Sequence, residues 1–356
     1  MKALSLSFWE LTPDPAPALP VALVFPFAGG NAHSVREWAE RLPGYRTIAV
    51  QYPGRGARTT EPFAESIEKL GAALADEYLD LLKEPPALLL GHSLGSLVAL
   101  ETALVLEERG MPAGALVVSA ASPPGTRASG AGPLSEALHG RPMHLLDDDV
   151  LADALVEAGG LPSEILGEPE LLALALPVVR HDFQLGWDYP YQPGRSVLCP
   201  LFAIGGTDDL AVPAEALGSW RSLAAGPFST RTWPGGHFYF RAEVPGLVDL
   251  VRPGRSGAPE AASAMPKKQT GPEARETMES GVLEAVLAVW SELLPTASVT
   301  TQTRFFESGG TSIAAMRACS KLSARLGVRV PVKILLTQGR LDEFAVEVSE
   351  LWRAAR

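Results

Sequence analysis

The stretch Leu88-Leu89-Leu90-Gly91-His92-Ser93-Leu94-Gly95 decides the fold of the larger part of this chain. Its leucines predict a buried strand, and residues 94–108 continue directly with apolar residues at helical spacing. Ser93 lies between the two elements with a glycine two residues away on each side, which is the G-x-S-x-G spacing of a tight strand-to-helix turn. The glycines are needed because a serine in such a turn has little room around its backbone. We therefore predict that Ser93 is an exposed nucleophile at the end of a strand.

Short apolar runs and helical patterns alternate on both sides of this turn. The expected strands are Val21–Phe27, Thr47–Val50, Ala87–Leu90, Ala115–Ser119 and Pro200–Ile204. Helical spacing marks residues 64–82 and 94–108 between them. Alternation of this kind predicts an α/β fold, with a mostly parallel sheet that helices cover on both faces.

Residues 126–190 interrupt the alternation, because they are rich in leucine at helical spacing and contain no clear strand. We predict a helical insertion over the sheet, of the kind that can act as a lid. Trp187, Met143 and the leucines of residues 145–176 are candidates for lining an acyl channel, but most of them are expected to form the core of this insertion. The run Asp147-Asp148-Asp149 is expected to be the solvated start of a helix, and no metal site is expected.

A serine nucleophile on this type of fold is followed along the chain first by an acid and then by a histidine. That order selects His237, which follows a late strand, as the base that takes the proton of Ser93. The remaining histidines precede Ser93, lie inside the turn or fall in the insertion: His33, His92, His139, His144 and His181.

The acid is expected just after the strand Pro200–Ile204, where Gly205-Gly206-Thr207-Asp208-Asp209 offers two adjacent aspartates. Asp209 is our first choice, and Asp208 is the alternative, with a role in capping the turn. Asp182 is a weaker third candidate. The acid would orient the imidazole and stabilise its protonated form.

The negatively charged oxygen of a tetrahedral intermediate needs backbone N–H donors. In this fold one donor comes from the residue after the nucleophile and the other from a loop after an early strand. The sequence places these donors at Leu94 and Ala28, with Phe27 as the alternative to Ala28.

Length and composition suit a domain of about 250 residues plus a small one. The chain has 356 residues, of which 46% are apolar and 20% charged, and its formal net charge is −11. No basic face points to nucleic acid, and no apolar run is long enough to span a membrane. Neither a signal peptide nor a metal-binding cysteine pattern is evident, since the two cysteines, Cys199 and Cys319, are far apart. We expect a protein of the reducing cytoplasm.

Residues 252–276 are dominated by proline, glycine, serine and alanine, and we predict a linker there. A flexible segment of this length has an r.m.s. span of roughly 25–30 Å. It would separate a domain over residues 1–251 from a second domain over residues 277–356. The second domain shows only helical periodicity, as in the stripe Val282, Val286, Trp290, Leu294, and three or four short helices are expected.

Five spaced motifs in residues 18–250 resemble those of type II thioesterases of nonribosomal peptide and polyketide synthesis. They are Phe25-Pro26-Phe27-Ala28-Gly29-Gly30, Gln51-Tyr52-Pro53-Gly54-Arg55-Gly56, Gly91–Gly95, Arg180-His181-Asp182-Phe183 and Gly236-His237-Phe238. The resemblance implies an α/β-hydrolase that removes acyl groups from the phosphopantetheine thiol of carrier proteins. Asp209 holds the place where such relatives often have an Asp-Pro pair. Phe27 departs from the histidine often found at its position.

The C-terminal domain resembles a peptidyl carrier protein through Phe305-Phe306-x-x-Gly309-Gly310-x-Ser312-Ile313, with supporting stretches at Trp290–Leu294 and Gly327–Pro331. The resemblance implies a small four-helix domain in which a phosphopantetheinyl transferase attaches 4′-phosphopantetheine to Ser312. A serine at a helix N-terminus would place the phosphodiester beside the positive end of the helix dipole. The alternative is that Ser312 only caps the helix. The order of domains departs from the usual one, because the hydrolase here precedes the carrier.

The sequence thus predicts hydrolysis of acyl- or aminoacyl-phosphopantetheine thioesters through an acyl-Ser93 intermediate, with carrier proteins as partners. Acyl transfer between carriers is one alternative. The other is a carrier domain that serves for docking, with an accessory hydrolase.

Overall fold

The computed structural model describes residues 1–125, 141–190, 194–251, 280–294, 298–305, 308, 312–328, 330–331, 334–335 and 340–354. The chain divides into two compact units, Lys2–Gly257 and Ala258–Arg356, the latter together with Met1. The predicted linker, residues 252–276, lies outside the described residues.

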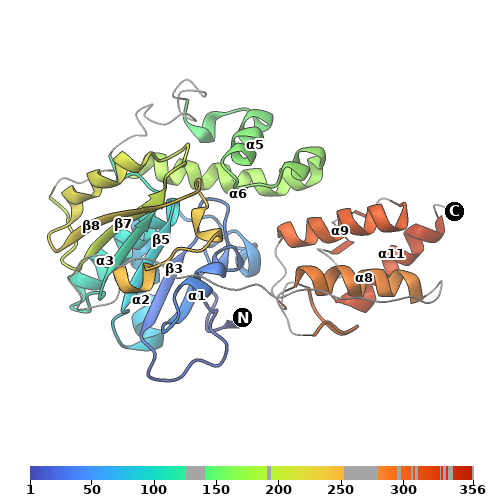
Figure 1. Ribbon diagram of the computed structural model, residues 1–356, viewed down its shortest axis with the longest axis horizontal. Coiled ribbons are helices and arrows are strands. Elements are labelled where there is room, and N and C mark those ends of the chain that lie inside the picture. The colour runs from blue at the N-terminus through green and yellow to red at the C-terminus, as the bar shows by residue number, and fades with distance from the viewer. Residues whose placement is uncertain are drawn as a thin grey trace. The chain divides into compact units, whose positions relative to one another are not determined.

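An eight-stranded sheet forms the centre of the larger unit, in the order β1-β2-β4-β3-β5-β6-β7-β8 (Figure 1). The strands are β1 (Lys2–Ala3), β2 (Phe8–Glu10), β3 (Val21–Phe25), β4 (Arg46–Val50), β5 (Leu88–His92), β6 (Leu116–Ser119), β7 (Leu201–Gly206) and β8 (Phe228–Trp233). In the part of this order from β4 to β8 all neighbouring pairs are parallel, whereas β1 at the edge and β2 beside it pair antiparallel. The predicted parallel sheet is therefore confirmed.

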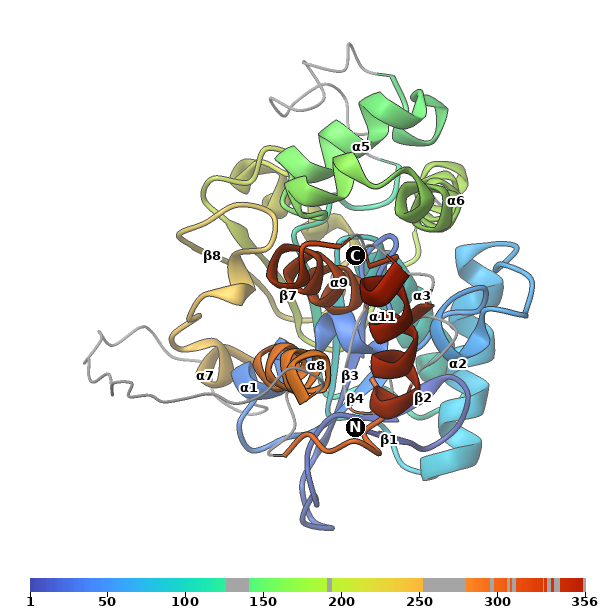
Figure 2. The same ribbon diagram turned by 90° about the vertical axis from the view of Figure 1, so that its right-hand side faces the viewer.

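The apolar side chains of each central strand divide between two cores because they alternate across the sheet. Val21, Leu23 and Phe25 of β3 pack in the core that contains α2 (Ile67–Leu82) and α3 (Leu94–Glu108). Ala22 and Val24 pack in the opposite core, with α1 (Glu37–Arg41) and α7 (Leu247–Val251). Figure 2 shows these helix pairs on opposite sides of β3 and β4. Helices on both faces explain why every residue of β3 is buried.

The predicted insertion is helical where it is described. It contains η3 (Met143–Leu145), α5 (Asp148–Glu157), η4 (Ser163–Gly167) and α6 (Pro169–Asp188). Its buried leucines and a valine form a separate apolar core: Leu146, Leu151, Leu155, Leu176 and Val179. Met143 packs against this core, whereas Trp187 is 41% exposed and does not belong to it. Residues 126–140 of the insertion lie outside the described residues.

The smaller unit is helical, as expected. Its helices are α8 (Ser280–Leu293), α9 (Ser312–Leu326) and α11 (Leu341–Ala354). Trp290 is fully buried at their centre, with its ring 4.8 Å from that of Phe305 and 5.8 Å from that of Phe344. Residues 334–335 are also helical, whereas residues 332–333 and 336–339 lie outside the described residues. Across the described parts of both units, no helix is long and apolar enough to cross a membrane.

Candidate active site

The loops after β3 and β5 meet at the point where the strand order of the sheet reverses. These strands are neighbours, but the chain continues from β3 to β4 on one side and from β5 to β6 on the other. Ligands of open α/β sheets bind at such a switch point, beyond the carboxyl ends of the strands. Ser93 follows β5, and residues 26–30 follow β3, so both predicted parts of the site lie there.

Ser93 occupies a strained backbone conformation, with φ +53° and ψ −122°. A Cβ atom on Gly91 would lie 2.1 Å from the carbonyl oxygen of Gly95, and one on Gly95 would lie 2.2 Å from that of Phe25. Both positions therefore require glycine. The N–H of Ser93 donates to the Ser119 carbonyl at 2.8 Å, which fixes the turn to the neighbouring strand. The turn is a nucleophile elbow in geometry as well as in sequence.

His237 and Asp209 form a close pair, with Nδ1 of the imidazole 2.8 Å from Oδ2 of the carboxylate. The Asp209 side chain is fully buried, and its other oxygen accepts from the N–H groups of Ala211 at 2.8 Å and Val212 at 3.1 Å. A histidine that donates its Nδ1 proton to a fixed carboxylate carries its basic lone pair on Nε2. The pair can therefore accept a proton from a hydroxyl group.

Asp208 faces a different group. Its carboxylate accepts from the Gly235 N–H at 3.1 Å, and its own N–H donates to the Gly235 carbonyl at 2.9 Å. These two bonds hold the loop that carries His237. Asp182 is also occupied elsewhere, since it is fully buried and accepts from Gly29 and Arg55.

A buried aromatic cluster borders His237, and sequence reasoning missed it. The ring of His92 lies 5.1 Å from that of His237 and packs against Phe27, Phe238 and Phe240. Phe27 thus serves as an aromatic wall beside His92 and Phe238. Burial lowers the pKa of His92 well below its usual value of 6.5, so this neighbour of His237 is uncharged at neutral pH.

His92 also begins a chain of buried hydrogen bonds. Its Nδ1 lies 2.9 Å from the Ser119 hydroxyl, which lies 2.9 Å from the Tyr239 hydroxyl. Burial raises the pKa of Tyr239 above its usual value, so the phenol keeps its proton. The three residues are far apart in sequence, so no local pattern predicts these hydrogen bonds. The one available signal is that His92 lies next to Ser93 and Tyr239 lies close to His237.

The predicted oxyanion donors lie at the two meeting loops. Leu94 is the first residue of α3, and Ala28 lies in a turn closed by a 2.8 Å hydrogen bond from the Gly30 N–H to the Phe27 carbonyl. A helix start offers backbone N–H groups to an anion. The site can therefore combine a nucleophile, a base with its orienting acid, and donors for an oxyanion.

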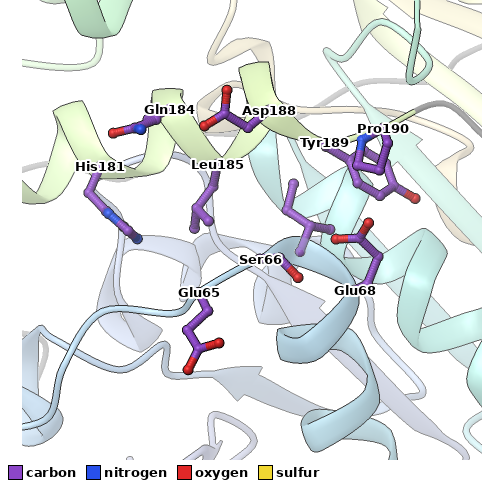
Figure 3. Close-up of a pocket in the computed structure, with 10 residues that line it drawn as sticks. Glu65, Ser66, Glu68, His181, Gln184, Leu185, Asp188, Tyr189 and Pro190 are labelled. Atoms are coloured by element: carbon purple, nitrogen blue, oxygen red, sulfur yellow. The ribbon is translucent and has the colours of Figure 1, made fainter.

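A separate polar pocket of about 390 Å³ lies between the start of α2 and helix α6 (Figure 3). His181 and Leu185 extend from α6 towards the start of α2, and Gln184, Asp188 and Glu65 also line the pocket. None of Ser93, Asp209 and His237 lines this pocket, so it is distinct from the candidate site.

In the smaller unit, Ser312 is the first residue of the 15-residue helix α9. The N–H groups and the positive dipole end of a helix start fit a phosphodiester on that serine. Phe306, Gly309 and Gly310 of the same motif lie outside the described residues.

Comparison with known proteins agrees with this geometry. The family model described as thioesterase domain matches residues 22–253. The chain belongs to the thioesterase family. A second model, phosphopantetheine attachment site, matches residues 284–346. The protein is thus a serine thioesterase with a fused domain for covalent attachment of 4′-phosphopantetheine.

Relatives of this chain include thioesterases whose names place them in biosynthetic pathways. It is 36% identical to thioesterase PikA5 of Streptomyces venezuelae, over 65% of this chain and 79% of that protein. It is 34% identical to a probable cadicidin biosynthesis thioesterase of Streptomyces griseus, over 65% of this chain and 61% of that protein. The solved structure of the type II thioesterase BorB from the borrelidin cluster matches with a TM-score of 0.60 and 30% identity, over 70% of this chain and 98% of BorB. The expected resemblance to type II thioesterases is confirmed.

Proposed function

We propose that this thioesterase hydrolyses acyl- or aminoacyl-phosphopantetheine thioesters on carrier proteins, with Ser93 as nucleophile, His237 as base and Asp209 as orienting acid. The observation that carries the proposal is the 2.8 Å contact between Nδ1 of His237 and the carboxylate of Asp209. Asp209 lies on the loop after β7 and His237 on the loop after β8, at the same end of the parallel sheet as Ser93. Membership of the thioesterase family supports the same reaction.

The reaction follows from the chemistry of these groups. His237 Nε2 takes the proton of the Ser93 hydroxyl as Oγ attacks the thioester carbonyl carbon, and the N–H groups of Leu94 and Ala28 stabilise the resulting oxyanion. The carbon–sulfur bond breaks, and His237 returns the proton to the leaving thiol. Water, activated by His237, then hydrolyses the acyl-Ser93 ester and releases a carboxylic acid.

Ser312 is our proposed attachment residue for 4′-phosphopantetheine, since it begins α9 within the matched attachment domain. The arm supplies a thiol that carries an acyl group as a thioester. A phosphopantetheinyl transferase is the partner that installs it. Carrier domains of nonribosomal peptide or polyketide synthases are the further partners, and the cytoplasm is the proposed location. The free, buried Cys199 and Cys319 suit that reducing compartment.

Ser93→Ala tests the hydrolase. We expect thioester hydrolysis to fall by several orders of magnitude, because triad serines cannot be replaced by the remaining groups. Circular dichroism and unfolding curves should stay unchanged. A folded Ser93→Ala protein with near-normal turnover would refute the assignment.

Ser312→Ala tests the carrier. Coexpression with a phosphopantetheinyl transferase should add one arm to the wild-type chain and none to Ser312→Ala, as read by intact-mass spectrometry. Ser308→Ala, which alters a nearby serine, is the matched control and should still be loaded. An arm on the Ser312→Ala chain would place the attachment site elsewhere.

A further inference from the structure

Asp182 connects the inserted helix α6 to two loops of the sheet. Its carboxylate is 1% exposed and forms a bidentate ion pair with Arg55, whose guanidinium is 6% exposed. Arg55 Nη2 donates to Oδ1 at 2.7 Å, and Nη1 donates to Oδ2. The same Oδ2 accepts from the N–H of Gly29 at 2.7 Å. One buried carboxylate therefore accepts three hydrogen bonds from two loops that follow neighbouring strands, β3 and β4.

The loop around Gly29 lies directly against α6. Gly29 has φ +77°, and a Cβ atom there would lie 2.4 Å from Cγ2 of Val179. Val179 and Asp182 are three residues apart on α6 and so share one helix face. The helix thus contacts Gly29 through packing as well as through a charged hydrogen bond.

Two further bonds hold this loop, one within the loop and one to the segment that follows β4. Gly30 N–H closes the turn onto the Phe27 carbonyl at 2.8 Å, and the Tyr52 hydroxyl donates to the Pro26 carbonyl at 3.0 Å. Ala28 lies between these fixed points, one peptide unit before the Gly29 N–H that Asp182 holds. The Ala28 N–H belongs to the peptide whose Phe27 carbonyl accepts from Gly30, and Asp182 anchors the next peptide of the same turn at the Gly29 N–H. The direction of the Ala28 N–H therefore depends on both anchors.

A buried ion pair of this kind contributes more to geometry than to stability. The desolvation of both charges offsets much of their attraction, whereas the bidentate fork fixes the carboxylate in one orientation. Donors for an oxyanion act through such fixed orientation, because they need no reorganisation when charge develops. Asp182 meets this requirement from the insertion, 153 residues after Gly29.

We propose that Asp182, held by Arg55, is a positioning residue for the oxyanion loop. It orients the Gly29 peptide and through it the Ala28 N–H. The inference rests on the proposed function, since it assigns Ala28 as a donor to the oxyanion of thioester hydrolysis. It gives the third acid candidate a role that differs from that of the acid beside His237.

The test compares Asp182→Asn with a matched control, Glu101→Gln. Glu101 is likewise a buried acid, on α3, and it accepts from the Tyr189 hydroxyl and from Arg195 at 2.6 Å and 3.0 Å. Tyr189 follows α6, so this cluster also ties α6 to the core, but it involves none of residues 26–30. The two variants remove equivalent charges at different distances from the oxyanion loop.

Two ligands of the full-length protein separate positioning from structural damage. An alkyl boronic acid forms a tetrahedral adduct with Ser93 and places an oxygen at the oxyanion position, whereas an S-alkyl-pantetheine thioether occupies the substrate site without a carbonyl group that Ser93 could attack. For Asp182→Asn we expect kcat and boronate affinity to fall together by about 10–100-fold, somewhat less than the loss of a whole donor. KM and thioether affinity should stay within about threefold of wild type, and Glu101→Gln should leave the boronate-to-thioether ratio unchanged.

Arg55→Lys provides a second variant if Asp182→Asn fails to fold, because lysine keeps the charge but loses the fork. It should shift the boronate-to-thioether ratio in the same direction, by a smaller factor. An unchanged ratio in the folded variants, or equal weakening of both ligands, would overturn the positioning role. A wild-type protein that binds the thioether but hydrolyses no thioester would overturn the proposed function instead.

Discussion

Asp208 and Asp209 are adjacent, yet their carboxylates face different groups. Asp209→Asn should lower kcat by about 10⁴-fold, because an amide at this position no longer stabilises the protonated imidazole and favours the wrong tautomer of His237. Asp208→Asn should cost far less, since its amide oxygen can still accept from the Gly235 N–H. Steady-state hydrolysis of one acyl-pantetheine thioester by both variants provides the measurement. The reverse ranking would transfer the role of the acid to Asp208.

His92 makes the stability of the fold sensitive to acid. Its pKa is held well below 6.5 by burial in the native protein but returns to about 6.5 on unfolding. At pH values below about 6.5 the unfolded chain therefore binds more protons than the native protein. The free energy of unfolding keeps its full value with respect to His92 above this pH and decreases as the pH falls below it. One such group contributes a slope of up to about 1.4 kcal/mol per pH unit.

His92→Asn should remove this slope, because asparagine keeps a polar group near the Nδ1 position and does not titrate. Urea unfolding of both proteins between pH 5 and pH 8 measures the difference. Parallel pH dependences in the two proteins would show that His92 does not titrate on unfolding.

The order rule for serine, acid and histidine was enough to nominate Ser93, His237 and the aspartate pair from sequence. It could not reveal the bond between Arg55 and Asp182, because 127 residues separate them and neither residue type is unusual on a surface. The aromatic wall around His92 was hidden for the same reason. Contacts of this kind are set by tertiary packing, which leaves no local pattern in the sequence.

At the scale of the elements, the strand-to-helix turn imposes the sharpest steric requirement. Gly95→Ala should lower the free energy of unfolding by about 1–3 kcal/mol and reduce kcat, because the new methyl group must displace the backbone at Phe25. Gly218→Ala is the matched control: it lies in η5 (Ala214–Leu223), is exposed and has open space around its Cβ position. Urea unfolding and turnover measure both variants, and equal stability of the two would contradict the steric argument.

Element boundaries followed the sequence where apolar periodicity was strong. Helix α3 spans the predicted residues 94–108, whereas the sequence set no bounds for α6, which runs from Pro169 through Pro177 to Asp188. A proline at this position usually ends a helix, but the burial of Val179, Asp182 and Leu185 maintains α6 beyond Pro177. The short antiparallel strands β1 and β2 were not predicted because two and three residues are too few to show a pattern.

At the scale of the whole molecule, the fusion predicts a kinetic consequence. The sequence of residues 252–276 predicts a flexible tether, and such a tether gives an effective concentration of order millimolar when its reach allows contact. We therefore expect hydrolysis of an acyl group on the Ser312 arm of the same chain to exceed that on a micromolar carrier added separately. Single-turnover loss of the acyl group at several protein concentrations measures this.

A fast phase that is independent of protein concentration should appear in the loaded full-length wild type. The comparison mixes Ser93→Ala protein, loaded on its arm, with unloaded wild type, so that hydrolysis can occur only between chains. Equal rates in the two experiments would show that the substrate arm belongs to another protein.

Three consecutive residues of α6 reach three different places. Arg180 donates to the carbonyls of His144 and Leu146 at 2.6 Å and 2.7 Å, and His181 lies 2.9 Å from the Ala64 carbonyl before α2. Asp182 holds Gly29. A displacement of this one helical turn would therefore break the bonds to η3 and to the segment before α2, and it would release the oxyanion loop in the same movement. While this turn of α6 is displaced, the Ala28 N–H would lack its fixed orientation. An acyl carrier that meets the enzyme in this state would leave with its thioester intact.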